Sequence, residues 1–152
     1  MNAAPWRDKL ARFVRLSGAD KWLLLRAAWW LAIARVMLAV VPFGRLAERL
    51  SSRPGSGAGA IDAAPDPEFL RRVGRAVSVA ANHVPWRSDC FPQTIAARML
   101  LQRRGYDSTI HFGVERIGEA GLAAHAWLTC GEIVVTGGAE LERYTEVHRL
   151  RA

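Results

Sequence analysis

The sequence has few cysteines and lacks the spacing of a metal site. Its 152 residues include two cysteines, Cys90 and Cys130, which form no C-x-x-C motif, and four histidines without the spacing of zinc ligands. Two cysteines without a secretory signal favour a reducing compartment over a disulfide framework. We therefore expect a cytoplasmic protein with no structural metal and no cofactor.

The sequence also lacks an uninterrupted apolar run long enough to cross a membrane. Its most hydrophobic segment, residues 22–43, is interrupted by Arg26 and Arg35, whereas a span needs about 20 apolar residues. The two arginines lie on opposite sides of a helix that is otherwise apolar nearly all round. We expect this helix to pack on its own domain, with docking onto another protein or peripheral contact with a membrane as alternatives.

A block of lysines and arginines is missing too, although the chain is basic. The formal net charge is +7, which favours an anionic partner. Because the arginines are spread along predicted helices and no nucleic-acid motif occurs, we expect no nucleic acid and keep an acidic peptide or a membrane surface as partners. A hydrophobic content of 51% is sufficient for a folded core.

Composition divides the chain into three parts. Residues 1–50 are predicted to be helical, with a start near Asp20 and a break at Pro42. Residues 51–66 are rich in Gly, Ala, Ser and Pro and are predicted to be a flexible linker. Residues 67–152 are predicted to form the main domain.

The main domain begins with two predicted helices and ends with strands. Asp66 and Pro67 have the pattern of a helix start, and this helix must end before Pro85. A second, largely buried helix runs from Cys90 to Gly105. From residue 108 the apolar period changes to two, and residues 123–138 contain two strands joined by a tight turn at Cys130-Gly131. This order predicts an α+β fold with a small antiparallel sheet.

Cys90 is the candidate nucleophile. It lies where the second helix begins, and the partial positive charge and free N–H groups of a helix N-terminus favour a thiolate. The same N–H groups can stabilise the oxyanion that forms when a thiolate attacks a carbonyl.

His125 is the candidate base, because a thiol nucleophile needs a proton acceptor nearby. A turn at Cys130-Gly131 would pair Trp127 with Val134 and His125 with Thr136. One face of the hairpin would then carry these four residues, and we expect the cysteine helix to pack there. The other face is purely apolar.

The motifs "W..DCF.Q..AARMLL.RRG", "HFGV" and "AHAWL..G..VVTGG" resemble the transglutaminase-like B2 proteins of lasso peptide biosynthesis. The resemblance covers residues 84–138 and implies a papain-like or transglutaminase-like fold. It also implies a cysteine peptidase that removes the leader from a ribosomally made precursor. Cys90 matches the nucleophile of that family and His125 its base.

The third catalytic residue of the family, an acid on the strand after the histidine, has no obvious counterpart. In the pairing given above Thr136 would occupy its position. The imidazole would then be oriented by Thr136, by water, or by an acid from elsewhere in the chain, and the activity could be weakened.

The resemblance also implies three partners: the precursor peptide, a separate leader-recognition protein and a lasso cyclase. We expect the N-terminal helices, with Trp22, Trp29 and Trp30, to dock such partners or membrane-associated export machinery. Two alternatives remain for the function. The thioester could be transferred to an amine in place of water, or the chain could be a catalytically silent binding module.

The remaining candidate residues have simpler interpretations. Trp86 and Trp127 are candidates for contact with the substrate, although Trp86 could equally pack the turn before Cys90. His83 and His111 are predicted to be structural residues. Cys130, at the tip of the predicted hairpin, is predicted to be an exposed thiol without a role.

Overall fold

The computed structural model describes residues 16–51, 65–118, 121–139 and 141–151. The elements in chain order are α2 (Gly18–Val40), α3 (Phe43–Ser51), α4 (Pro67–Ala81), α5 (Cys90–Gln102), β1 (Thr109–Ile117), β2 (Gly121–Cys130), β3 (Ile133–Thr136), a 3-10 turn (Leu141–Arg143) and β4 (Thr145–Arg151). Helices followed by an antiparallel sheet confirm the predicted α+β class. Most of the predicted linker lies outside the described residues, so the division into three parts stays a prediction.

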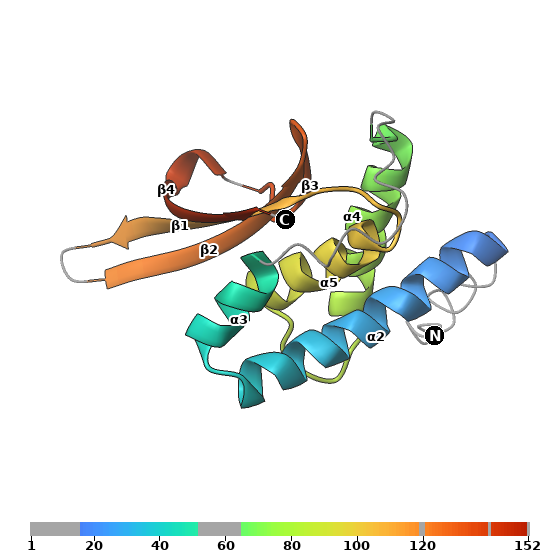
Figure 1. Cartoon of the computed structure of the whole chain (residues 1–152), viewed down its shortest axis with the longest axis horizontal. Helices are drawn as coiled ribbons and strands as arrows, with labels where there is room; N and C mark the ends of the chain where they lie inside the picture. The colour runs from blue at the N-terminus through green and yellow to red at the C-terminus, as the bar shows by residue number, and fades with distance from the viewer. Residues whose placement is uncertain (1–15, 52–64, 119–120, 140, 152) are drawn as a thin grey trace, which may run out of the picture.

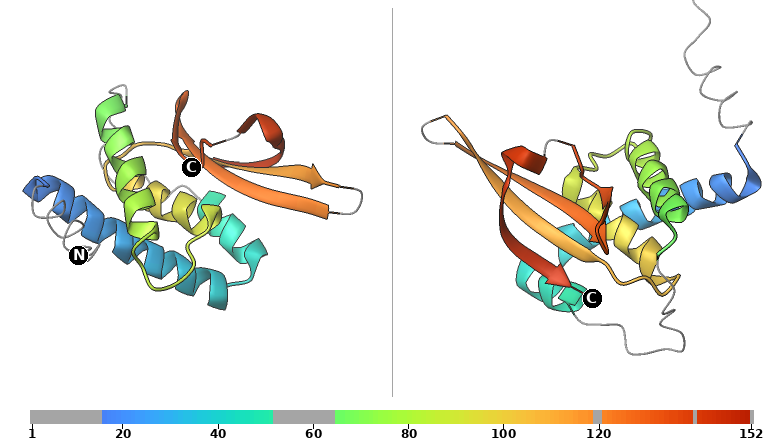
Figure 2. Two further views of the ribbon diagram at one scale, coloured as in Figure 1. Left: turned by 180° about the vertical axis from the view of Figure 1, so that it is seen from behind. Right: turned by 90° about the horizontal axis from the view of Figure 1, so that it is seen from above.

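The elements form three layers. The four-stranded sheet lies on one side, α4 and α5 pack against it, and α2 crosses the far side of these two helices (Figure 1). Two further views show the same order, with the hairpin of β1 and β2 projecting beyond the helices (Figure 2). The main core therefore lies between the sheet and α5, with a second apolar contact between α2 and the pair α4 and α5.

Helix α2 begins and ends where the sequence predicts. The Ser17 side chain caps it by accepting a hydrogen bond from the Asp20 backbone N–H at 3.1 Å. The helix ends at Val40, two residues before Pro42, as expected from the missing N–H of proline. Its buried residues, which pack on α4 and α5, are Ala27, Leu31 and Ala34.

Helix α4 also follows the prediction. The Asp66 carboxylate accepts a hydrogen bond from the Glu68 N–H at 2.9 Å, and Pro67 occupies the first helical position. Apolar residues that recur at three- and four-residue spacing along it are buried: Phe69, Val73, Val77 and Ala80.

Helix α5 is buried along most of its length, and it includes an arginine that the sequence does not mark. Arg98 is fully buried and donates hydrogen bonds to the Leu150 carbonyl, at 3.4 Å, and to the Leu50 carbonyl. Leu50 lies in the last turn of α3, where a cation is favourable. Burial lowers the pKa of Arg98 to about 10. Arg98 thus links α5 to α3 and β4.

The sheet has the strand order β3-β2-β1-β4, with every pair antiparallel. Side chains alternate between two faces. We call the face that packs on α5 the helix face; it carries Ile110, Phe112, Leu128 and Leu150. We call the opposite face the outer face; it carries His111, Gly113, His125 and Trp127.

The outer face is covered by the connection between β3 and β4. These strands form the two edges of the sheet, so the chain must cross β2 and β1 between them. The crossing is anchored by an Arg143 to Glu115 ion pair at 2.9 Å and by Tyr144, which stacks on His125. Through Tyr144, the connection between β3 and β4 becomes part of the candidate site.

In the hairpin of β2 and β3 the turn lies one residue later than predicted. Its turn is Gly131-Glu132, with Gly131 at φ 57°, and Cys130 pairs with Ile133. A bulge between Leu128 and Thr129 then shifts the pairing again. The predicted turn at Cys130-Gly131 is therefore wrong.

Two predictions that depended on this turn are also wrong. Thr136 pairs with Leu128 and does not lie opposite His125. Cys130 is a core residue with 2% of its surface exposed, and burial raises the pKa of its thiol. The bulge places Thr136 on the face of Leu128, because a shift of one residue exchanges the two faces of a strand. The later turn makes Cys130 the last residue of β2, on the helix face with Leu128.

Candidate functional site

Cys90 is the first residue of α5. Asp89 occupies the cap position in an extended conformation, but its side chain makes no capping hydrogen bond and instead lies 3.5 Å from Arg87. The Cys90 and Phe91 N–H groups can therefore receive an anion, whereas Pro92 has no N–H and the Gln93 N–H bonds to the Asp89 carbonyl. The Cys90 thiol is free and half-buried.

The loop before Cys90 is held by Gln93. Its Nε2 donates a hydrogen bond to the Ser88 carbonyl at 2.8 Å, which ties the first turn of α5 to the preceding loop. Among the described residues, neither the buried Trp86 Nε1 nor the Ser88 hydroxyl has a hydrogen-bond partner. The loop thus places two unsatisfied polar groups close to Cys90 in sequence, and substrate contact by Trp86 stays a prediction.

His125 donates a hydrogen bond to a backbone carbonyl. Its Nε2 lies 2.8 Å from the Gly137 oxygen at the end of β3. A carbonyl only accepts, so Nε2 carries the hydrogen. In the neutral ring Nδ1 is then the unprotonated nitrogen, which is the form that a general base requires.

Two aromatic rings fix the plane of the His125 imidazole. Tyr144 stacks on it with centroids 4.7 Å apart and planes 26° apart, and Trp127 lies 6.3 Å away at 20°. Trp127 is buried, with 8% of its surface exposed. The predicted neighbours His125 and Trp127 are therefore brought together, and the burial of Trp127 places it in the packing of the outer face. Its contact with substrate stays a prediction.

Glycine at two positions allows the chain to pack closely around Trp127 and Tyr144. A Cβ on Gly113 would lie 2.8 Å from the Trp127 ring and 3.0 Å from the Tyr144 Cβ. A Cβ on Gly137 would lie 2.6 Å from the Ala126 oxygen, and the backbone there has φ 72°. A side chain at either position would push the covering connection away from His125.

His111 adds a further stacked ring next to Trp127 on the outer face. Its ring stacks on Trp127 with centroids 5.2 Å apart and planes 4° apart. Its Nε2 lies 2.9 Å from the Thr129 hydroxyl and its Nδ1 3.2 Å from the Glu146 carboxylate. His111 was predicted only as a structural residue; its spacing of two from Gly113 was the available signal that it shares the face of His125.

Phe91, next to Cys90, and His125 lie on opposite faces of the sheet. The ring of Phe91, next to Cys90, packs on Phe112 of the helix face, with centroids 5.2 Å apart. His125 pairs with Gly113, the following residue of β1, and its ring lies on the outer face. No hydrogen bond joins Cys90 to His125, both of which are described. The prediction that α5 packs against the His125 face is wrong, because the fully apolar side of β2 faces the helix.

Thr136 does not orient His125. Its hydroxyl is buried and has no hydrogen-bond partner among the described residues. The Gly137 carbonyl, one residue later, accepts the His125 hydrogen bond instead. A backbone dipole therefore occupies the position where an acidic side chain was expected.

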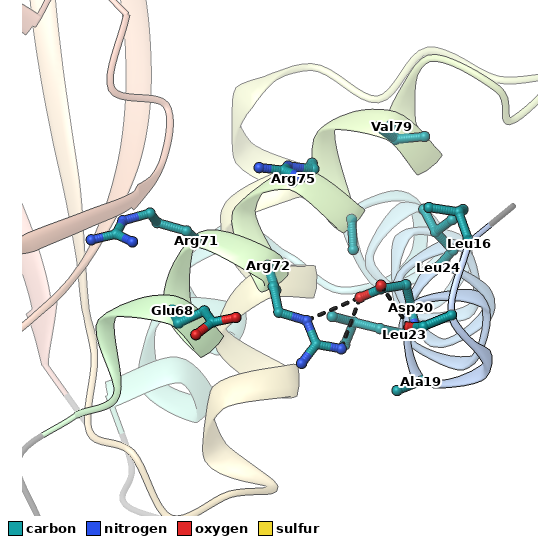
Figure 3. Close-up of a pocket in the computed structure, with 12 residues that line it drawn as sticks. Leu16, Ala19, Asp20, Leu23, Leu24, Glu68, Arg71, Arg72, Arg75 and Val79 are labelled. Carbon is teal, nitrogen blue, oxygen red and sulfur yellow. Dashed lines mark hydrogen bonds and ion pairs between the residues drawn. The ribbon is translucent and has the colours of Figure 1, made fainter. Parts of the chain in front are cut away.

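Two cavities that lie between or beside the helices are not lined by Cys90. The larger, about 550 Å³, is lined by residues of α2 and α4. Figure 3 shows Arg72 of α4 reaching Asp20 of α2, with a contact of 2.8 Å, while Arg71 and Arg75 extend away from Asp20. Within the described ranges, no three His, Cys, Asp or Glu residues gather to hold a metal ion.

Comparison with known proteins agrees with this architecture. A family model described as the transglutaminase-like superfamily matches residues 22–149, and the chain belongs to this superfamily. Neither the curated proteins nor the solved structures yield a significant match.

Proposed function

We propose that the protein is a cysteine peptidase that removes the leader from a ribosomally made lasso peptide precursor. Membership of the transglutaminase-like superfamily supports a thiol mechanism, and the resemblance of residues 84–138 to the B2 proteins supports the substrate class. The observation that carries the proposal is the His125 to Gly137 hydrogen bond, because it leaves Nδ1 free to accept a proton.

The proposed reaction has two stages. His125 Nδ1 takes the proton of the Cys90 thiol, and the sulfur attacks the carbonyl carbon of the leader–core amide. The protonated imidazole then gives its proton to the departing amine of the core peptide, which leaves the leader as a thioester on Cys90. Water, deprotonated by His125, hydrolyses this thioester to the free leader and the thiol.

The N-terminus of α5 serves the first transition state. The N–H groups that Asp89 leaves uncapped are the donors for the oxyanion on the attacked carbonyl. The Gly137 carbonyl holds the imidazole in one tautomer, as a carboxylate would, but it supplies a dipole and no full charge. We therefore expect slower catalysis than with an acid at this position.

The proposed mechanism requires one adjustment of the structure. Cys90 and His125 share no hydrogen bond, and the Phe91 ring next to Cys90 packs on the face of the sheet opposite the His125 ring. Catalytic hydrogen bonds are often loose before the substrate binds. The proposal requires the thiol and Nδ1 to come within hydrogen-bond distance in the complex.

The proposal includes partners. A separate recognition protein would deliver the leader, as the resemblance to the B2 proteins implies. A lasso cyclase would then use the new amino terminus of the core peptide.

The test is incubation of the protein with a cognate precursor and its recognition protein, followed by mass spectrometry. We expect leader and core as products, and loss of cleavage in Cys90→Ala and in His125→Ala. Cys130→Ala, the matched control for a cysteine variant, should retain activity. Intact precursor with the wild-type protein, or cleavage by Cys90→Ala, would contradict the proposal. A precursor whose mass increases by an added amine would indicate acyl transfer.

A catalytically silent binding module is the second candidate. The placement of α5 and the His125 ring on opposite faces of the sheet favours it, as does the absence of an acid next to His125 among the described residues. Such a protein would bind the precursor equally well as wild type, Cys90→Ala and His125→Ala, and none would cleave it.

A further inference from the structure

Helix α2 exposes a continuous apolar stripe. Trp22 is 63% exposed, Leu25 58%, Trp29 66%, Val36 61% and Val40 74%. At 3.6 residues per turn these five side chains fall within an arc of about 60°, over a length of about 27 Å. We call these five residues the α2 stripe.

The α2 stripe lies opposite the side of α2 that packs on the protein. The buried residues Ala27, Leu31 and Ala34 project about 180° from the centre of the stripe. One side of the helix is thus part of the core, and the other is apolar and more than half exposed. Soluble monomers rarely leave a contiguous apolar surface of this kind uncovered.

The charges beside the α2 stripe are positive. Lys21 and Arg26 lie on either side of its first turns. The only acid of the helix, Asp20, faces the other way and pairs with Arg72 (Figure 3). Asp20 therefore lies on the side of α2 away from the stripe.

A hollow of about 310 Å³ combines both features. It is lined by Trp22, Leu25, Arg26, Trp29, Trp30 and Arg103. The Arg103 guanidinium lies 5.4 Å from the centre of the Trp30 ring. Arg26 makes no ion pair with any described residue. The hollow thus presents two guanidinium groups beside indole rings and has room for an anionic group.

We propose that the α2 stripe binds the surface of an anionic membrane, with the helix parallel to the bilayer plane and lipid phosphates next to Arg26 and Arg103. Tryptophan, leucine and valine would enter the interface, and the arginines would meet the headgroups. By length and composition alone α2 could cross a membrane. Its packing against α4 and α5 through Ala27, Leu31 and Ala34 favours the parallel orientation, which leaves these contacts in place. The uniformly positive flanks favour a lipid surface over a second copy of this equally basic chain.

The test is co-sedimentation of the full chain with vesicles of phosphatidylcholine alone and of phosphatidylcholine mixed with phosphatidylglycerol. We expect binding to the mixed vesicles that weakens as salt is added. Trp22→Gln combined with Trp29→Gln should lower the partition coefficient by about tenfold or more. Arg26→Gln should lower binding to the mixed vesicles by several-fold and leave binding to neutral vesicles unchanged.

The matched control replaces two equally exposed apolar residues of the sheet. Leu122 is 72% and Val147 59% exposed, and Leu122→Gln combined with Val147→Gln should bind vesicles as the wild type does. Circular dichroism checks that every variant is folded. Absence of binding to mixed vesicles would overturn the proposal, as would equal loss in the control. A wild-type dimer that the tryptophan variant converts to a monomer, without vesicle binding, would assign the stripe to a second copy.

Discussion

The two faces of the sheet differ in how they are covered. The helix face packs on α5 through aliphatic residues such as Ile110 and Leu128, both fully buried. The outer face is covered by a single stretch of backbone and by aromatic and histidine rings, including His125 and Tyr144. Stability is thus concentrated on one face, and titratable groups with defined hydrogen bonds on the other.

We infer that the two faces of the sheet have different roles. Apolar packing on the helix face fixes where the strands lie and where α5 begins. The outer face is then free to hold His125 by a carbonyl and two rings. Variants of the helix face should therefore change the free energy of unfolding, and variants of the outer face should change chemistry at His125.

The largest effect on stability is expected at Arg98, on the helix side. Arg98→Ala would leave a cavity and two buried carbonyls without a donor, at a cost of about 3–5 kcal/mol. Arg98→Met retains most of the volume and should cost less. Urea denaturation measures both, and a loss below about 1 kcal/mol in Arg98→Ala would show that this buried cation does not link α5 to α3 and β4.

The pH dependence of Arg98 follows from its pKa. Because burial lowers the pKa in the folded state to about 10, below its usual range, the folded protein carries the cost of the buried charge at neutral pH. This cost is relieved as pH rises through 10. The stability of the wild type should therefore increase relative to Arg98→Met between pH 10 and the onset of alkaline denaturation, as urea titrations at several pH values would show.

Gly137→Ala should have the next largest effect, and on the outer face. Its Cβ would lie 2.6 Å from the Ala126 oxygen, at a φ of 72°. We expect a loss of about 2 kcal/mol in the free energy of unfolding and a weaker His125 hydrogen bond. Gly118→Ala is the matched control, because φ is 60° there but nothing lies near its Cβ. Equal losses of unfolding free energy in the two variants would show that the positive φ, and not the contact with the Ala126 oxygen, causes the loss.

Tyr144→Leu should have a smaller effect. Loss of the stack on His125 should cost about 1 kcal/mol in the free energy of unfolding. Tyr144→Phe retains the ring and should resemble the wild type. If Tyr144→Phe loses as much as Tyr144→Leu, the hydroxyl and not the stacked ring contributes the stability. Thermal unfolding of the three proteins distinguishes these results.

Asp20→Asn should have the smallest effect, in a region that touches neither face. Hydrogen bonds from Ser17 and then from Arg72 lower the pKa of the Asp20 carboxyl below 3.8. Its contribution is therefore present above pH 3.8 and is lost as pH falls through the lower folded value. The variant should be slightly less stable at neutral pH and no different from the wild type in strong acid. A change in Cys90 reactivity in this variant would contradict the separation of Asp20 from the candidate site.

The sequence was sufficient to predict the elements with strong local signals. The caps at Asp66 and Pro67 fix α4, and the alternation from Thr109 onward predicts β1. Cys90 was placed correctly at the first residue of a buried helix. These features depend on contacts within a few residues, which propensity and periodicity report.

Long-range features could not be predicted in the same way. A bulge at Leu128 and a turn displaced by one residue moved Thr136 away from His125. The Gly137 carbonyl carries no side-chain signal, and Tyr144 reaches His125 only because the chain crosses the sheet. Buried Arg98 likewise depends on two carbonyls that lie 48 and 52 residues away in sequence.

The most direct test of the central claim, that His125 is the base for Cys90, needs no substrate. Iodoacetamide alkylation of Cys90 and Cys130 can be followed together by peptide mass spectrometry, with the buried Cys130 as internal reference. We predict that Cys90 reacts faster than Cys130 at neutral pH, and that His125→Ala slows Cys90 by about tenfold or more without changing Cys130. An unchanged Cys90 rate in His125→Ala would contradict the account.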